Sequence, residues 1–432
     1  MKKYHFSRDI RQKLEYLYAL DGKGIKPGLS RVQAFLDRIG NPHEKLTAIH
    51  VAGTNGKGST CAIIASVLQA AGYNVGLYTS PHLVRFNERI RVNGKKISDA
   101  EIAGFLDGKH NIIEELDTSF FETTTAMAFD YFVRKKVDIA VLETGLGGRL
   151  DATNVVTPLV SVITAIGKDH EKFLGNTIEK IALEKAGIIK PGVPVISARQ
   201  APVVLEILKK EALSKNCPFI YSPDMCRIQV NHRCFDRQEL SISVKDESVH
   251  QLKFALLGDH QLVNLETAIT VLRQIQQFKV NFDSMVRGIA ATRWHGRLEL
   301  LSGSPVIYYD VGHNEHGIRQ VVRTLQQIFP EDKFRLLIAL GGKKKVDSLG
   351  QILADLTDRV YVSEIPNGKS FPARELANRL ARGLSEAEIT VEPNISKALT
   401  HSVQTLKSEE HLLILGSHYI APAIYDFFKI NV

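Results

Sequence analysis

Cysteines and long apolar runs are scarce in this sequence, and each absence excludes a class of protein. The four cysteines, Cys61, Cys217, Cys226 and Cys234, form no CxxC pair, and the segment 1–16 lacks the apolar stretch of a signal peptide. We therefore expect a reduced, cytoplasmic protein. No run of 18 apolar residues occurs, so we expect no segment that spans a membrane.

Positive charges only slightly outnumber negative charges, and the net charge is +8. Such a mildly basic surface can attract anionic ligands such as nucleotides or polycarboxylates. The basic residues are scattered, and no signature of an RNA- or DNA-binding module occurs. We therefore expect no nucleic acid partner.

Two regions of the chain alternate between short apolar runs and helical patterns, which is typical of α/β proteins. In the first region, apolar runs that suit strands cover residues 46–52, 74–80, 137–143, 159–165 and 193–197. Helical patterns begin at Lys57 and lie within 121–135 and 177–189. Because runs that are apolar on both faces belong to buried strands, we predict a doubly wound, mainly parallel sheet.

Polar alternation replaces this pattern between residues 218 and 257 and predicts an antiparallel hairpin or small sheet at the edge of the first domain. Cys226, His232 and Cys234 lie close together there and could ligate a metal. A fourth ligand at suitable spacing is missing, which favours ordinary residues of a β-hairpin.

A second α/β alternation follows two predicted helices, at 259–276 and 282–291. Its expected strands cover residues 305–310, 334–340, 359–364, 388–392 and 411–416. We place a boundary near residue 295, so that two domains span 1–295 and 296–432. Clefts between two α/β domains often hold binding sites.

A glycine-rich segment, GTNGKGST, follows the first predicted strand and begins the first predicted helix. Its residues are Gly53, Thr54, Asn55, Gly56, Lys57, Gly58, Ser59 and Thr60. Backbone amides, a helix N-terminus and a lysine suit phosphate binding, although the usual spacing, GxxxxGK[ST], is absent. We predict a nucleoside triphosphate site, with Lys57 at the β and γ phosphates and Ser59 or Thr60 at magnesium or phosphate. A turn that merely packs is the alternative.

Glu143 has a functional interpretation from its own context, with a surface-cap glutamate as the alternative, whereas His170 and Lys185 gain one only in combination. Glu143 ends a buried strand before a second glycine-rich loop, where a carboxylate could hold magnesium directly or through water. His170 follows another strand end, where a single histidine is usually structural. Lys185 lies in the middle of a predicted helix, where a solvated lysine is the default.

Several motifs, in this order along residues 8 to 420, resemble those of the folylpolyglutamate synthase and dihydrofolate synthase family of the Mur-ligase superfamily. They are HVAGTNGKGST, TSPHLVRFNERIRV, LETGLGGRLDATN, the DH of GKDH, EKAGIIK and YDVGHNEHG. The resemblance implies a P-loop ATPase-like domain of the Mur-ligase type over 1–295 and a smaller, Rossmann-like α/β domain over 296–432. The glycine after Lys57 is itself a mark of that superfamily.

For the metals, the resemblance implies two Mg²⁺ sites, with potassium as a further cation. Lys57 and Ser59 match contacts to phosphate and magnesium, while Ser80 and Glu143 match ligands of the first magnesium. His170 matches a ligand of the second. Lys185 matches a lysine that carbon dioxide converts into a carbamate, and Lys57, His170 and Lys185 are the implied catalytic residues.

For the substrates, the resemblance implies contacts to ATP and to a folate. The remaining contacts to ATP would be Asn264, Arg297, Asp310, His313 and Asn314. The segment VGHN departs from the family's commoner AHNP, but His313 and Asn314 are kept. Contacts to the pterin or folate would be Phe120, Phe121, Glu122, Leu150, Asp151 and Ala152. Aromatic rings can stack on a pterin and carboxylates can accept its amino hydrogens, whereas without the resemblance both phenylalanines read as core.

The implied activity is an ATP-dependent ligation of L-glutamate to folates, and also to dihydropteroate, through an acyl phosphate. Another Mur-type amino-acid ligase is one alternative, but those enzymes carry an extra N-terminal domain of roughly a hundred residues, for which we expect no room ahead of Gly53. A P-loop kinase or a regulatory nucleotide-binding module is the other. The family leans monomeric.

Overall fold

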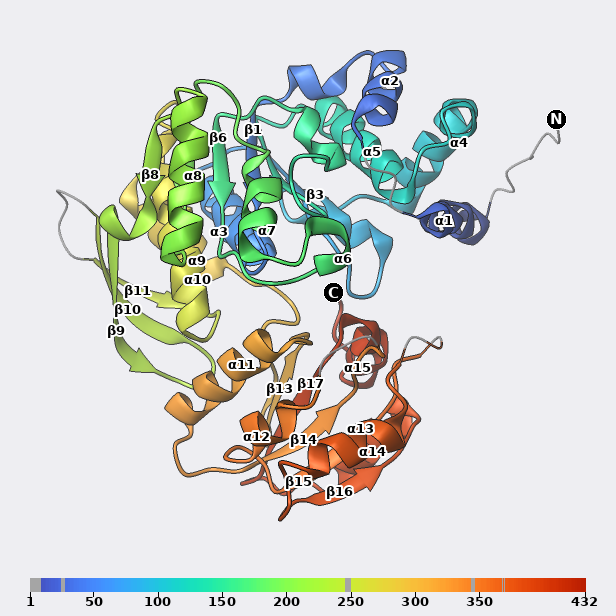
Figure 1. Ribbon diagram of the computed structural model, residues 1–432, viewed down its shortest axis with the longest axis vertical. Helices are drawn as coiled ribbons and strands as arrows, with labels where there is room; N and C mark the ends of the chain where they lie inside the picture. Colours follow the sequence, from blue (N-terminus) through green and yellow to red (C-terminus); the bar gives the residue numbers. More distant parts are fainter. Residues whose placement is uncertain (1–8, 25–27, 245–249, 343–345, 367, 369) are drawn as a thin grey trace.

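The computed structural model describes residues 9–24, 28–244, 250–342, 346–366, 368 and 370–432. Its upper part in Figure 1 holds an eight-stranded and a three-stranded sheet, and its lower part a six-stranded sheet. This confirms the predicted α/β fold class. Residues 1–8 of the segment 1–16, which we expect to lack a signal peptide, lie outside the described residues.

The eight-stranded sheet has the order β4-β3-β2-β5-β1-β6-β7-β8. Its strands are β1 (Ala48–Ala52), β2 (Val75–Tyr78), β3 (Ile90–Val92), β4 (Lys95–Lys96), β5 (Ile139–Glu143), β6 (Val160–Ile163), β7 (Val195–Ser197) and β8 (Phe219–Tyr221). All pairs are parallel except β2 with β3 and β3 with β4. The five strands expected in this region are therefore confirmed, and the sequence missed β8 as a parallel strand.

Helices cover both faces of this sheet, as a doubly wound arrangement requires. They are α1 (Ile10–Ala19), α2 (Ser30–Arg38), α3 (Lys57–Ala70), α4 (Asp99–Glu115), α5 (Phe120–Arg134), α6 (Glu171–Leu174), α7 (Ile178–Ala186), α8 (Pro202–Ser214), α9 (Asp259–Gln274) and α10 (Phe282–Ala291). Along β5, Ile139 and Val141 belong to the core under α3, whereas Ala140 and Leu142 belong to the core under α5. Successive side chains of a strand point to opposite faces, so a strand buried on both faces is apolar throughout.

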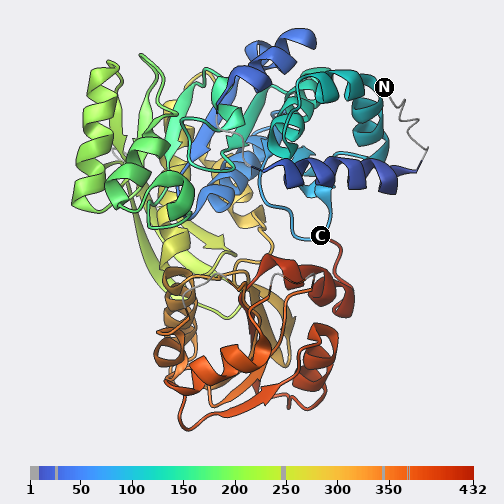
Figure 2. The same ribbon diagram turned by 45° about the vertical axis from the view of Figure 1, so that its right-hand side comes forward.

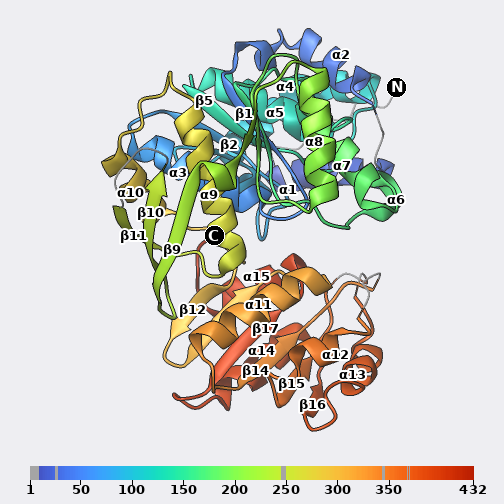
Figure 3. The same ribbon diagram turned by 60° about the vertical axis from the view of Figure 1, so that its left-hand side comes forward.

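The predicted small antiparallel sheet is present and consists of β9 (Cys226–Arg233), β10 (Gln238–Val244) and β11 (His250–Phe254). It is separate from the main sheet and lies beside α9 and α10 (Figure 3). Leu240 and Phe254 pack into the same core as these helices. Cys226 and His232 are residues of β9 paired with β10, which confirms the hairpin interpretation.

The lower part is a parallel sheet with one antiparallel edge strand, in the order β12-β13-β17-β14-β15-β16. Its strands are β12 (Glu299–Gly303), β13 (Val306–Asp310), β14 (Phe334–Ile338), β15 (Arg359–Val362), β16 (Glu388–Val391) and β17 (His411–Leu415). Its helices are α11 (Glu315–Ile328), α12 (Leu349–Leu353), α13 (Ala373–Ala381), α14 (Ile395–Gln404) and α15 (Ala421–Phe427). The C-terminus lies where the two parts face each other (Figure 2).

A search of the described residues finds no helix long and apolar enough to cross a membrane.

Close packing of α10 on α3 yields a stability prediction. A Cβ added at Gly288 would lie 2.4 Å from the Val67 Cα atom, so Gly288→Ala should push the two helices apart. We expect a loss of about 2 kcal/mol in the free energy of unfolding, measured by urea denaturation. Gly104→Ala on α4 is the matched control, because nothing lies within 4 Å of its added Cβ, and it should stabilise by about 0.5–1 kcal/mol. Equal stability of the two variants would contradict this account.

Candidate active site

A cavity of about 820 Å³ lies between the upper and lower parts and is lined by residues of both. Most of the predicted site residues line it: Thr54, Asn55, Gly56, Lys57, Gly58, Ser59, Ser80, Phe120, Phe121, Glu122, Glu143, Leu150, Asp151, Ala152, His170, Asn264, Arg297, Asp310, His313 and Asn314. Gly53, Thr60 and Lys185 are not among the lining residues. Residues that are far apart in the sequence are thus gathered around one space.

The glycine-rich loop fits tightly into its surroundings. Gly53 and Gly56 have φ angles of 153° and 88°, which favour glycine. An added Cβ would lie 1.9 Å from the Thr164 Oγ1 atom at Gly53 and 2.0 Å from the Asn264 Oδ1 atom at Gly56. Neither position can therefore hold a larger residue without displacing Thr164 or Asn264.

Lys57 is the first residue of α3, and its ammonium group folds back over the loop. It donates to the carbonyl oxygens of Gly53 and Thr54, at 3.2 and 3.3 Å. The hydroxyl of Thr60, one turn further along the helix, is buried without a hydrogen-bond partner among the described residues. A cation and a helix N-terminus together make an anion site.

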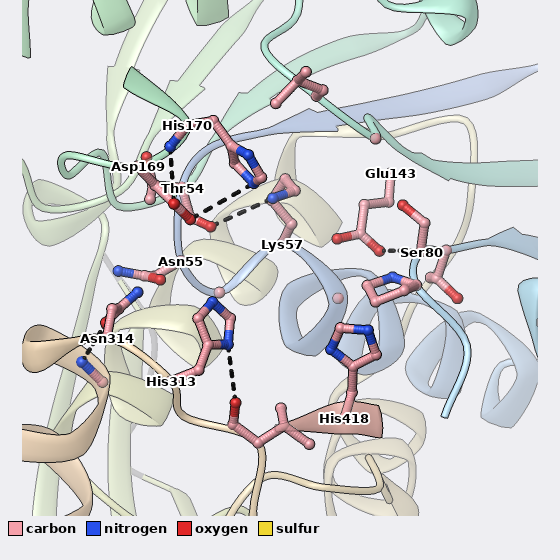
Figure 4. A pocket seen from close by; sticks show the side chains of 18 of the residues that line it. Thr54, Asn55, Lys57, Ser80, Glu143, Asp169, His170, His313, Asn314 and His418 are labelled. Atoms are coloured by element: carbon pink, nitrogen blue, oxygen red, sulfur yellow. Dashed lines mark hydrogen bonds and ion pairs between the residues drawn. The ribbon is translucent and has the colours of Figure 1, made fainter. Parts of the chain in front are cut away.

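Glu143 lies beside this loop because β5 pairs in parallel with β1, with Val51 opposite Glu143. Its carboxylate is 4% exposed and accepts a hydrogen bond from the Ser80 amide at 3.0 Å (Figure 4). Burial raises the pKa of Glu143, and the charge of Lys57 opposes that rise. A buried carboxylate is costly unless a cation accompanies it.

These groups fit a magnesium ion. No group of three or more His, Cys, Asp or Glu side chains within the described ranges could hold a metal by itself. Magnesium, however, is commonly held by one or two carboxylates together with water and substrate phosphates, and a hydroxyl is also an oxygen ligand. Glu143, Ser80 and Ser59 supply such oxygens around the phosphate loop.

His170 lies on the other side of Lys57 from Glu143 (Figure 4). It precedes α6 with a φ of 50°, and its backbone amide donates to the Asp169 carboxylate at 2.8 Å. Its side chain is 56% exposed. Asp169 also lines the cavity; the sequence analysis gave it no role, although it is the first residue of the DH motif that ends at His170.

Lys185 lies behind the loop rather than in the cavity. It is 4% exposed, and its ammonium donates to the Gly53 carbonyl oxygen at 2.6 Å. Burial and the nearby charge of Lys57 lower the pKa of Lys185 to about 7. A solvated lysine, the default interpretation of its sequence position, is therefore wrong.

On the nucleotide side, several predicted contacts already have protein partners. Asn264 donates from Nδ2 to the Gln261 side chain at 2.9 Å, and Asn314 caps α11 by accepting from the Gly317 amide at 2.8 Å. Asn55 reaches across the cavity to His316, with 3.4 Å between their side-chain nitrogens. The loop of the upper part thus touches the lower part directly.

Asp310 ends β13 and is buried facing the cavity. Its carboxylate accepts from the amides of Leu298 and Gly312, at 2.7 and 2.6 Å. Burial raises its pKa, and the charge of Arg297 opposes the rise. His313 follows, with its Nδ1 atom 3.1 Å from the Val311 carbonyl oxygen.

The two carboxylates predicted to contact the pterin are engaged in shaping the chain. Glu122 accepts from the Ser119 amide at 2.8 Å in a capping box and from Arg31 at 3.1 Å. Asp151 accepts from two amides of its loop, those of Gly145 and Leu146. It accepts two further bonds, from the amide and the hydroxyl of Thr153. A pterin contact at either residue remains a prediction.

The aromatic wall of the cavity consists of Phe120 and Phe121, and Leu150 and Ala152 also line the cavity. Phe121 is half-buried, and its ring lies 2.5 Å from where a Cβ at Gly145 would be. Phe120 is 8% exposed, whereas Leu150 is 38% exposed. Ala152 is buried at the wall's edge. This wall can receive a flat, largely apolar ring.

Trp294 is a lining residue that the sequence reasoning missed. Its indole would lie 3.0 Å from a Cβ at Gly58, so the glycine after Lys57 makes room for this ring. The guanidinium of Arg91 lies over the same indole ring, 5.8 Å from its centroid. The only signal was the position of the chain's single tryptophan, three residues before Arg297.

Comparisons with known proteins agree with this fold and cavity. Residues 51–272 match the Mur ligase middle domain, and residues 296–418 match the Mur ligase, glutamate ligase domain. The dihydrofolate synthase/folylpolyglutamate synthase of Bacillus subtilis is 37% identical, over 92% of this chain and 94% of that protein. The folylpolyglutamate synthase of Lacticaseibacillus casei is 32% identical, over 91% and 92%.

A solved structure gives the same result. The folylpolyglutamate synthase of Thermotoga maritima has a TM-score of 0.86 and 31% identity, over 97% of this chain and 96% of that chain. The fold and the cavity thus define an ATP-dependent ligase. The chain belongs to the Mur ligase family, in its folylpolyglutamate synthase and dihydrofolate synthase branch.

Nucleotide binding should be visible in the fluorescence of Trp294, because the indole packs on the phosphate loop and is the only one in the chain. Titration with ATP and magnesium should give a saturable change. Lys57→Ala removes a charge-assisted contact and should weaken binding roughly 10- to 100-fold. Trp294→Phe is the control and should abolish the signal. Unchanged affinity in Lys57→Ala would remove this lysine from the nucleotide site.

Proposed function

We propose that the protein joins L-glutamate to folates, and also to dihydropteroate, with ATP as co-substrate and ADP and phosphate as products. The observation that carries this proposal is the cavity, in which Lys57, Glu143 and the Phe120–Phe121 wall lie between two α/β parts. A related structure from Mycobacterium tuberculosis is complexed with ADP, and one from Escherichia coli with DHPP and ADP. ADP, which is bound in both structures, is the nucleotide product of the proposed reaction.

In the first step, the substrate carboxylate attacks the γ-phosphorus of ATP. A bond forms between carboxylate oxygen and phosphorus, the bond to the bridging oxygen breaks, and ADP leaves. Lys57 and the amides at the start of α3 stabilise the negative charge of the transferring group. Two magnesium ions, held by Ser59, Ser80 and Glu143 and by His170, would supply further charge neutralisation, with potassium as an additional cation.

In the second step, the amine of glutamate attacks the carbonyl carbon of the acyl phosphate. The tetrahedral intermediate expels phosphate with its electron pair, the nitrogen loses a proton, and an amide remains. An acyl phosphate hydrolyses in water, so the site must exclude water. Asn264 from the upper part and Arg297, Asp310, His313 and Asn314 from the lower part would hold ATP together, and closure of the two parts completes the site.

Lys185 is proposed to work as a carbamate. Its neutral amine attacks carbon dioxide, a bond forms between nitrogen and carbon, and a proton is released. Because the pKa of Lys185 lies near 7, much of the amine is neutral at neutral pH. The product is an anion beside Gly53 and Lys57, which replaces repulsion between two cations with attraction and supports a metal.

The proposal includes an organisation and a setting for the enzyme. Residues 1–295 act as the ATP-binding unit and residues 296–432 as the unit that closes over it. Phe120, Phe121 and Glu122, together with the segment 150–152, hold the folate. The enzyme acts as a monomer on small molecules in the cytoplasm.

The direct test is product analysis with purified enzyme. ADP should form only when magnesium, a pterin substrate and glutamate are all present, with one ADP released per amide formed. Dihydropteroate and tetrahydrofolate, each with radiolabelled glutamate, report the two activities separately. Phosphorylation of an alcohol without glutamate would instead identify a P-loop kinase, and a preference for a different amino acid would indicate another Mur-type ligase.

Lys185→Ala should lose most activity, and short carboxylates such as acetate should restore part of it by replacing the carbamate. In the wild type, dependence of the rate on dissolved carbon dioxide should grow as pH rises through about 7, because the neutral amine reacts and the protonated amine does not. Lys190→Ala is the control: its ammonium bonds the Asn154 carbonyl at 2.7 Å outside the cavity, so acetate should have no effect on its rate. The mass of the intact protein, measured under conditions that preserve carbamates, should include one added carbon dioxide. A mass that lacks this addition would count against the proposed role of Lys185.

A further inference from the structure

Arg89 is a buried cation in the cavity wall to which the proposed reaction gives no role. It is the last residue of a short 3₁₀-helix, Phe86–Arg89, that leads into β3. Its side chain lines the cavity and the residue is 8% exposed. Its guanidinium lies 5.0 Å from the centroid of the Phe120 ring, on the aromatic wall.

The charge of Arg89 has no anionic partner in the described part of the chain. Its Nε atom donates to the Nδ1 atom of His82 at 2.8 Å, which is its only side-chain hydrogen bond there. Because the Nδ1 atom accepts this hydrogen bond, it carries no proton, and the His82 ring is a neutral acceptor and not an anion. The two Nη groups have no protein acceptor among the described residues.

Arg335 is another buried arginine of the chain, and protein groups compensate its charge fully. It is 5% exposed and donates to the Ser402 carbonyl and to Thr405, and it pairs with Glu410 at 3.1 Å. Leaving a guanidinium buried without such partners is unfavourable unless a ligand supplies them. The planar fork of Nη groups suits a carboxylate in particular.

The position of Arg89 indicates which carboxylate this is. It lies on the aromatic wall over Phe120, whereas Lys57 is the cation that bonds to the phosphate loop itself. Arg89 is also close enough to Glu143 for each charge to affect the pKa of the other. The reacting carboxylate must reach the γ-phosphate over Lys57. A folate that ends in glutamate carries a second carboxylate on the α-carbon, a few bonds from the reacting γ-carboxylate.

We propose that Arg89 binds the non-reacting α-carboxylate of the terminal glutamate of a folate substrate, with neutral His82 orienting the guanidinium from behind. This rests on the proposed function and adds a specificity residue to it. Dihydropteroate has only its reacting carboxylate and cannot use this contact. Arg89 therefore favours substrates that already carry glutamate.

The test compares tetrahydrofolate with its α-carboxamide analogue, in which only the non-reacting carboxylate is neutralised. For the wild type, kcat/KM should favour the carboxylate by roughly tenfold or more, since hydrogen bonds to charged groups are the stronger class. In Arg89→Gln this ratio should fall to about one, while kcat/KM with dihydropteroate changes little. Arg89→Lys keeps the charge without the fork and should give an intermediate ratio.

Arg85→Gln is the matched control, because Arg85 is exposed and pairs with Asp99 outside the cavity; its ratio should equal that of the wild type. The wild-type preference is measured without any variant, so poor folding of Arg89→Gln does not block the test. A wild type that treats both compounds alike, or an Arg89→Gln enzyme that keeps the preference, would overturn the assignment. If the wild type forms no glutamate-dependent ADP with any pterin, the proposed function itself fails.

Discussion

The pairing of β1 with β5 and β6 at the centre of the main sheet is the constraint on which the site depends. It is parallel and sets Val51 opposite Glu143 and Ala52 opposite Ile163. The carboxyl ends of the three strands therefore meet at one edge of the sheet, where crevices in α/β proteins receive ligands. A one-residue slip would turn Glu143 toward the opposite face and bring Thr164 out of contact with Gly53.

Positive charge concentrated behind this edge explains why the cavity suits anions. Lys57 and Lys185 both donate to the same oxygen, that of Gly53, and each charge disfavours the other. Arg89 and Arg297 add two more cations on the walls. Glu143 and Asp310 are buried carboxylates whose pKa values are raised by burial and held down by those cations. The site is a set of unbalanced buried charges, and phosphates, carboxylates and metal ions are the ligands that balance them.

The parts of the fold that the sequence predicted are those in which local pattern and burial agree. Strands such as β5 are apolar throughout because both faces are covered, and the polar alternation of β10 reflects a sheet with one covered face. The strand β12 gave no such signal, since its residues are half-buried or exposed at a sheet edge.

Contacts between distant segments could not be read from the sequence in the same way. Gly58 marks the family, yet its physical reason is the ring of Trp294. Asp151 and Glu122 resemble substrate contacts, yet their oxygens are occupied by Thr153 and by Arg31 and the start of α5. The resemblance implied which residues gather at the site, and only the structure shows which hydrogen bonds they already make within the protein.

Arg297 lies in the linker between the two parts, and its neighbours in the chain are fixed to the lower part. Gly296 and Leu298 on either side of it have φ angles of 67° and 42°, and the Leu298 amide bonds to Asp310 on β13. A Cβ at Gly296 would lie 2.8 Å from the Val311 side chain, so the turn is tightly packed on the same strand. Any closing motion of the lower part would carry Arg297 with Asp310 toward the phosphate loop. A hinge for such a motion would lie before residue 296, next to Trp294, whose ring packs against Gly58 of that loop.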